Sequence, residues 1–250
     1  MPLPRQIYVH GFIYARGEKL SKSLGNVVDP VALANEYGVD ALRYYLLRSF
    51  PTGRDGEFTL ELFVELCNTH LANDLGNLAS RTVTMVHKYF DGHPPADWDP
   101  AAFRDATARG ALDALVAAAT GASAEVARGY EEFRLHDALA AAWTPVVRAN
   151  EFIERVKPWA LAKDSGRRAE LSTTLRALLE TLRLVAIWAW PAIPGKCEEL
   201  WSMLRLPGMP GETRDAAAAA HFGPGAEAAE KLAEVKSLFP RIEAKTDAQA

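Results

Sequence analysis

The feature that most limits the fold of this chain is a long stretch whose apolar residues return every three or four positions. Between residues 59 and 89 this spacing is shown by Leu62, Leu66, Leu71, Leu75, Leu78, Met85 and Tyr89. Such residues lie along one face of an α-helix. Similar stretches at 101–129, 131–156, 167–190 and 194–204 predict further helices. The chain is therefore expected to be mainly α, an antiparallel helix bundle with up-and-down connections.

The first part of the chain has a different pattern. Residues 5–18 predict two short strands, because apolar residues alternate there before a turn. Asp29 is a good N-cap and Pro30 suits the first helical position, so a helix is expected from there to about Tyr37. Another helix is expected to begin at Asp40.

Breaks in these patterns predict three regions. The proline and glycine cluster at 51–56 marks the first boundary, so residues 1–55 form a small β-containing unit with two helices. Residues 56–205 form the helical domain, and 206–250 an irregular segment. Within that segment we expect a short helix over about 225–237 and a disordered tail from Ala244.

Composition excludes several classes of protein. The net charge of −4 argues against binding of nucleic acid by backbone charge alone, although it allows contact with one RNA at a few defined points. There is no apolar run of about 18 residues and no signal pattern, which predicts a cytoplasmic protein. Cys67 and Cys197 lack the spacing of a zinc site, so we expect no metal site and two reduced, partly buried thiols.

The segment from Lys19 to Asn26 (Lys-Leu-Ser-Lys-Ser-Leu-Gly-Asn) carries the clearest chemistry. Its two lysines, three residues apart, place two cations in one loop, and its serines add hydroxyl donors. Such a loop suits a triphosphate whose leaving pyrophosphate gains negative charge. From composition alone, a solvated surface loop is the more common explanation.

The order of these residues resembles the Lys-Met-Ser-Lys-Ser signature of class I aminoacyl-tRNA synthetases, with Leu20 in place of the usual methionine. The resemblance continues through residues 24–30 and 37–46. It implies that Lys22 stabilises the transition state of adenylate formation and that Lys19, Ser21 and Ser23 help to close the loop over ATP with Mg²⁺. The loop is not a Walker phosphate loop, because the required glycine spacing is absent.

Three segments of the remaining chain resemble methionyl-tRNA synthetases in particular. They are 71–82, 154–163 and 238–243. The resemblance implies that Asn77, Arg81 and Trp159 read the methionine anticodon CAU.

The physical chemistry of these positions suits base recognition. Asn77 and Arg81 are four residues apart, so both project from one helix face and can hydrogen-bond to base edges. Trp159 follows Pro158, which interrupts helical hydrogen bonding and lets the indole face outward to stack on a base. The alternative is that Trp159 is a core residue and that Asn77 and Arg81 form a solvated face.

The resemblance implies a parent reaction in two steps. ATP and methionine first form an adenylate, and the methionine is then transferred to the terminal ribose of its tRNA. Met1 stands just before the strand that leads into the lysine loop, so we expect a truncated or split product, a fragment or a mis-started reading frame. The missing N-terminal half is expected to hold the methionine pocket. The isolated chain is then expected to be inactive and to expose apolar surface at its sheet. Alternatives are a stand-alone anticodon-binding module that acts with a separate catalytic chain, another class I synthetase, or a purely structural helical protein.

Overall fold

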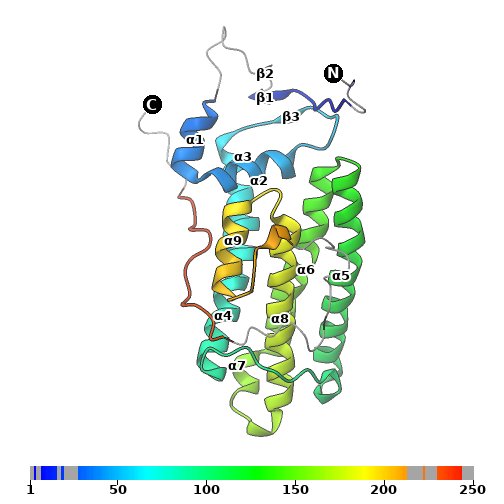
Figure 1. The fold of residues 1–250 in the computed structure, drawn as a ribbon, viewed down its shortest axis with the longest axis vertical. Coiled ribbons are helices and arrows are strands. Elements are labelled where there is room, and N and C mark those ends of the chain that lie inside the picture. The colour runs from blue at the N-terminus through cyan, green and yellow to red at the C-terminus, as the bar shows by residue number, and fades with distance from the viewer. Residues whose placement is uncertain are drawn as a thin grey trace.

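The computed structural model describes residues 3, 7–15, 18–19, 28–212, 222 and 230–243 and is mainly α-helical, as predicted (Figure 1). A small sheet stands at one end of the helices. Its central strand β1 (Ile13–Ala15) pairs antiparallel with β2 (Glu18–Lys19) and parallel with β3 (Gly56–Glu57).

The two strands predicted between 5 and 18 are present but shorter than expected. Residues 7–12 lie outside β1, and the side chains of Ile7 and Val9 are exposed there. The third strand was not predicted, because two residues are too few to show an alternating pattern. It places Gly56 opposite Ile13, so the chain returns to the sheet at the predicted boundary.

Helix α1 (Pro30–Tyr37) has the predicted bounds, and α2 (Val39–Ser49) begins one residue before the predicted Asp40. The Asp29 carboxylate accepts a hydrogen bond from the Val31 N–H at 2.9 Å, which caps α1. Gly38, with φ of 93°, separates the two helices in a conformation that side chains rarely adopt.

The helix predicted over 59–89 is one continuous rod with an unexpected centre. It consists of α3 (Leu60–Leu66), the π-helix η2 (Cys67–Gly76) and α4 (Asn77–Phe90). Phe63 and Leu75 are twelve residues apart. In an α-helix of about 3.6 residues per turn, their side chains would point in directions about 120° apart around the helix axis. Both are buried, because the wider π turns compensate for this rotation. The regular spacing of the sequence predicted a helix without revealing its type.

The other long helices form the bundle around α8 (Arg168–Ala189), which is buried along most of its length. Helices α5 (Ala106–Glu131) and α6 (Leu135–Val156) form a tight hairpin, followed by α7 (Pro158–Leu161) and later by α9 (Pro194–Met203). Short 3₁₀ turns lie at Pro100–Ala102, Ser165–Arg167 and Pro210–Glu212. In the described part of the chain no helix is both long and apolar enough to span a membrane.

The helix predicted over 225–237 is wrong for residues 230–237, which form an irregular segment. The Leu232 N–H donates to the Gly92 carbonyl and the Ala233 N–H to the Met203 carbonyl, at 2.8 and 3.0 Å. These bonds, to the turn after α4 and to the last residue of α9, replace helical ones, while Leu232 is buried. Residues 225–229 and the tail from Ala244 lie outside the described residues.

Candidate functional site

Of the three residues predicted to contact RNA bases, Arg81 lies near each of the other two. Asn77 is the first residue of α4, Arg81 lies one turn later, and Trp159 belongs to α7 (Figure 1). The guanidinium carbon of Arg81 is 6.0 Å from the centre of the Trp159 ring. Asn77 and Arg81 line the same open hollow. The fold therefore brings together two segments that are far apart in the sequence.

A break in the backbone places Trp159 at the surface. Helix α6 ends at Val156, Lys157 adopts φ of 52°, and Pro158 begins α7. The Trp159 side chain is left 40% exposed. This outward position agrees with the prediction made from Pro158. By contrast, Trp143, Trp188 and Trp201 are buried packing residues.

The hollow beside Trp159 is lined by polar side chains from two helices. The rod supplies Asn73, Asp74, Asn77 and Arg81, and α6 supplies Asn150, Glu151, Glu154 and Arg155. Amides and guanidinium groups donate hydrogen bonds, and amides and carboxylates accept them. This mixture can match the edge of a nucleic-acid base, which also carries both donors and acceptors.

One carboxyl in the hollow differs from an ordinary surface acid. Burial raises the pKa of Asp74 above its usual range, because desolvation disfavours the charged form. Asp74 therefore holds its proton to a higher pH than a fully solvated aspartate would.

The structure describes only the first residue of the lysine and serine loop, Lys19. Ser21, Lys22 and Ser23 lie outside the described residues, and Lys19 is described only as the last residue of β2. The chain resumes before the capped helix α1, so regular elements stand on both sides of the loop. These flanking elements lie at the opposite end of the molecule from α7 (Figure 1).

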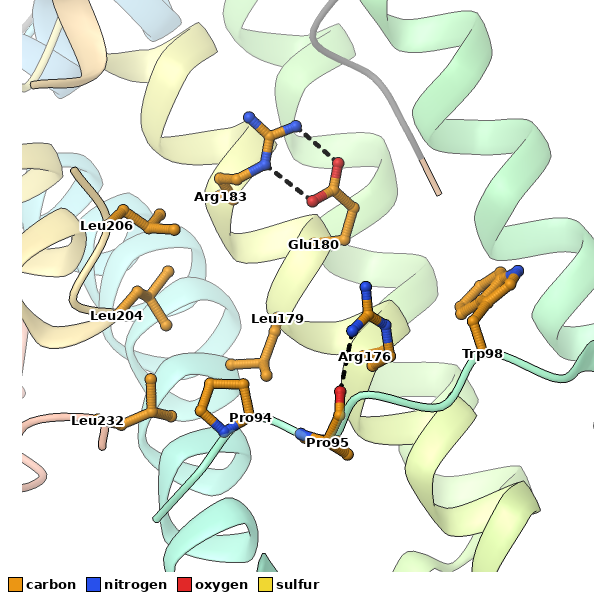
Figure 2. A pocket seen from close by; sticks show the side chains of 10 residues that line it. All are labelled: Pro94, Pro95, Trp98, Arg176, Leu179, Glu180, Arg183, Leu204, Leu206 and Leu232. Carbon is orange, nitrogen blue, oxygen red and sulfur yellow. Dashed lines mark hydrogen bonds and ion pairs between the residues drawn. The ribbon is translucent and has the colours of Figure 1, made fainter. Parts of the chain in front are cut away.

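A second hollow was missed by the sequence reasoning. Figure 2 shows Arg176, Glu180 and Arg183 of α8 beside an apolar wall formed by Leu204, Leu206 and Leu232. Arg183 forms two hydrogen bonds with Glu180, at 2.7 and 2.8 Å. Arg176 donates to the Pro95 carbonyl at 3.0 Å. Charged residues three and four positions apart usually indicate a solvated helix face, so only the tertiary structure shows that Arg176 and Glu180 are buried.

The two cysteines are free and buried, as predicted. Burial raises the pKa of Cys67 to about 12 and the pKa of Cys197 well above its ordinary value, so both thiols stay protonated at neutral pH. Among the residues that the structure describes, no group of three or more His, Cys, Asp or Glu could hold a metal ion.

Comparison with known proteins gives one consistent family. Residues 1–83 match the family described as tRNA synthetases class I (M), and residues 114–244 match the anticodon-binding domain of tRNA ligase.

Curated relatives agree with these matches. A methionine–tRNA ligase of Clostridium acetobutylicum is 39% identical over 246 residues, which are 97% of this chain and 36% of the relative. The Bacillus subtilis ligase is 38% identical over 99% of this chain and 36% of its own length.

Solved structures agree as well. Mycobacterium tuberculosis methionyl-tRNA synthetase in complex with methionyl-adenylate is similar with a TM-score of 0.81 and 38% identity. The match covers 96% of this chain and 45% of that structure. The apo form of the same enzyme matches with a TM-score of 0.79.

Proposed function

The chain belongs to the methionyl-tRNA synthetases of class I, and on that premise we propose that it serves the ATP-dependent attachment of methionine to its tRNA. It spans 36% of the length of the first curated relatives, so methionine binding and the complete reaction are proposed for the whole synthetase. We propose that this chain contributes the lysine loop and the recognition of the anticodon. Such a role belongs to the cytoplasm, where tRNA is charged.

The observation that carries this proposal is the exposed Trp159 indole beside Arg81. An exposed indole on a rigid backbone turn gives a flat surface on which an unpaired base can stack. Stacking on one aromatic ring contributes about 1–3 kcal/mol per base. We propose that Trp159 stacks on one base of the CAU anticodon.

Asn77 and Arg81 are proposed to read the edges of the anticodon bases. The Asn77 side chain is exposed, and within the described part of the chain its amide makes no hydrogen bond. Arg81 donates one hydrogen bond to Glu154. The Arg81 guanidinium has five N–H donors, so others are left for a base. Both side chains therefore retain hydrogen-bonding capacity toward a base in the hollow.

For the lysine loop we propose the roles that the family signature implies. Lys22 would place its ammonium group against the charge that develops on the leaving pyrophosphate, and Lys19, Ser21 and Ser23 would donate to the phosphates. Support comes from the family match over residues 1–83 and from the chemistry of these donors. Mg²⁺ bound with ATP would neutralise further phosphate charge.

The test is the variant Trp159→Ala, with binding of methionine tRNA as the measurement. Loss of one stacking contact is expected to weaken binding about 10- to 100-fold. Trp98→Ala would remove a partly buried indole outside the hollow and serves as the control. Unchanged affinity in a folded Trp159→Ala protein would rule out this anticodon role.

A second candidate function is a stand-alone anticodon-binding module that works with a separate catalytic chain. It is supported by the match of residues 114–244 to the anticodon-binding domain of tRNA ligase. Mixing the chain with the remaining part of a synthetase would distinguish the two. Restored aminoacylation in the mixture would favour the module.

A further inference from the structure

We infer that Asn150 of α6 is a positioning residue for anticodon reading, because it holds the helical turn from which Asn77 projects. This inference rests on the proposed function of Asn77. Asn150 is a partly buried residue in the wall of the hollow, and it acts through the backbone carbonyl of Asp74.

Two donors share that carbonyl. The Asn77 N–H donates both to the Asp74 carbonyl and to the Ala72 carbonyl five residues earlier. The side-chain amide of Asn150 donates to the Asp74 carbonyl at 3.1 Å. The position of one oxygen therefore depends on Asn150 and affects the backbone of Asn77 directly.

The orientation of the Asn150 amide follows from its surroundings. Its Nδ2 atom donates to the Asp74 carbonyl and also to the Val146 carbonyl one turn back on α6, both at 3.1 Å. Two carbonyl acceptors require the NH₂ group on that side. The Oδ1 atom is buried and has no hydrogen-bond partner in the described structure. The structurally useful part of this side chain is thus its N–H donor.

The π-helix explains why such a donor matters at this point. Long π-helical segments are rare, and isolated π turns often occur at functional sites. Side chains of α6 hold this one at two places: Trp143 Nε1 donates to the His70 carbonyl at 3.2 Å, and Asn150 holds the end next to Asn77. A return of this turn to ordinary α geometry would rotate Asn77 relative to α6.

The same two helices are linked a second time, one turn further along each. Arg81 follows Asn77 by four residues on α4, and Glu154 follows Asn150 by four residues on α6. The Arg81 guanidinium donates to Glu154 at 2.7 Å. Helix α6 therefore fixes both residues proposed to read base edges, Asn77 through its backbone and Arg81 through its side chain.

The test uses RNA hairpins that carry the methionine anticodon stem and loop, with either CAU or replaced anticodon bases. Asn150→Leu removes the donor while keeping an apolar side chain of similar size in a partly buried position. The loss of two donated hydrogen bonds and the removal of the unsatisfied buried Oδ1 act in opposite directions, so the melting temperature should change little. Affinity for the CAU hairpin should fall about tenfold. Asn150→Ala, which also carries no side-chain donor, is the second variant if the leucine disturbs packing.

A double-mutant cycle separates positioning from general stability. If Asn150 acts through Asn77, Asn150→Leu should weaken binding by much less in an Asn77→Ala background than in the wild-type protein. Trp143→Phe is the matched control, since it removes a donor to the same π-helix far from Asn77. It should alter affinity for the CAU hairpin less than about twofold.

Two results would overturn the inference in different ways. If the wild-type chain does not distinguish the two hairpins, the proposed anticodon recognition fails and the inference fails with it. The positioning role alone is wrong if the chain does distinguish them but the effects of Asn150→Leu and Asn77→Ala simply multiply. It is also wrong if Asn150→Leu and Asn150→Ala bind like wild type.

Discussion

The Arg81 guanidinium and the Glu154 carboxylate join α4 to α6 with 2.7 Å between Nη2 and Oε1. Their side chains are 29% and 63% exposed, so water and salt weaken the attraction. Exposed ion pairs contribute about 0.2–1 kcal/mol to stability. The main consequence of this pair is that it fixes the direction of Arg81 beside Trp159.

Glu154→Gln is therefore expected to affect specificity more than stability. The glutamine amide oxygen still accepts a hydrogen bond from Arg81, but the negative charge that attracts the guanidinium is lost. The free energy of unfolding should change by less than about 1 kcal/mol. The affinity for the CAU hairpin, relative to that for the hairpin with replaced anticodon bases, should fall. A change in unfolding free energy well above this limit, with an unchanged ratio, would show that the pair is structural.

Arg81→Lys should act as a loss of function although the charge is kept. An ammonium group cannot reproduce the planar fork that allows one side chain to bond Glu154 and a base together. We expect affinity for the CAU hairpin to fall about tenfold with no change in melting temperature. The matched control is Arg128→Lys, since Arg128 also pairs with a glutamate but lies on α5. Equal effects of the two variants on RNA affinity would contradict the assignment.

The close approach of α5 and α6 predicts opposite effects for two glycines of one helix. A Cβ at Gly129 would lie 2.8 Å from the Cβ and 2.9 Å from the Cα of Ala138, so Gly129→Ala must push the helices apart. We expect a loss of about 1–3 kcal/mol in the free energy of unfolding. Gly121→Ala meets no atom within 4 Å and should gain about 0.4–1 kcal/mol. The measurement is urea unfolding of both variants. The prediction is contradicted if Gly121→Ala, and not Gly129→Ala, lowers the free energy of unfolding.

His70 predicts a loss of stability in mild acid. Its pKa is lowered from 6.5, chiefly by burial and also by the Arg48 charge. The unfolded chain therefore binds a proton more readily than the native one, and stability falls as pH drops from about 6.5 toward the lower native pKa. His70→Gln, which keeps an acceptor for the Tyr44 hydroxyl, should reduce this dependence. Urea unfolding between neutral and mildly acidic pH would test it, and an unchanged slope in the variant would contradict it.

Several local features were predicted correctly because neighbouring residues decide them. Asp29 and Pro30 begin α1, and Lys157 and Pro158 end α6 and leave Trp159 exposed. Each depends on hydrogen bonds or dihedral angles within a few residues. The helix predicted over 225–237 is wrong for the described residues because backbone N–H groups there donate to Gly92, just after α4, and to Met203 of α9, which no local pattern reveals.

The sequence by itself determined that the chain is helical, where most helices begin and end, and which side chains are suited to bases or phosphates. Only the tertiary structure decided that Trp159 comes within 6.0 Å of Arg81, that Arg176 is buried, and that the rod contains a π-helix. These outcomes depend on packing between helices distant in the chain. The hydrogen bond from Asn150 to the Asp74 carbonyl is an example, because it joins residues 76 positions apart.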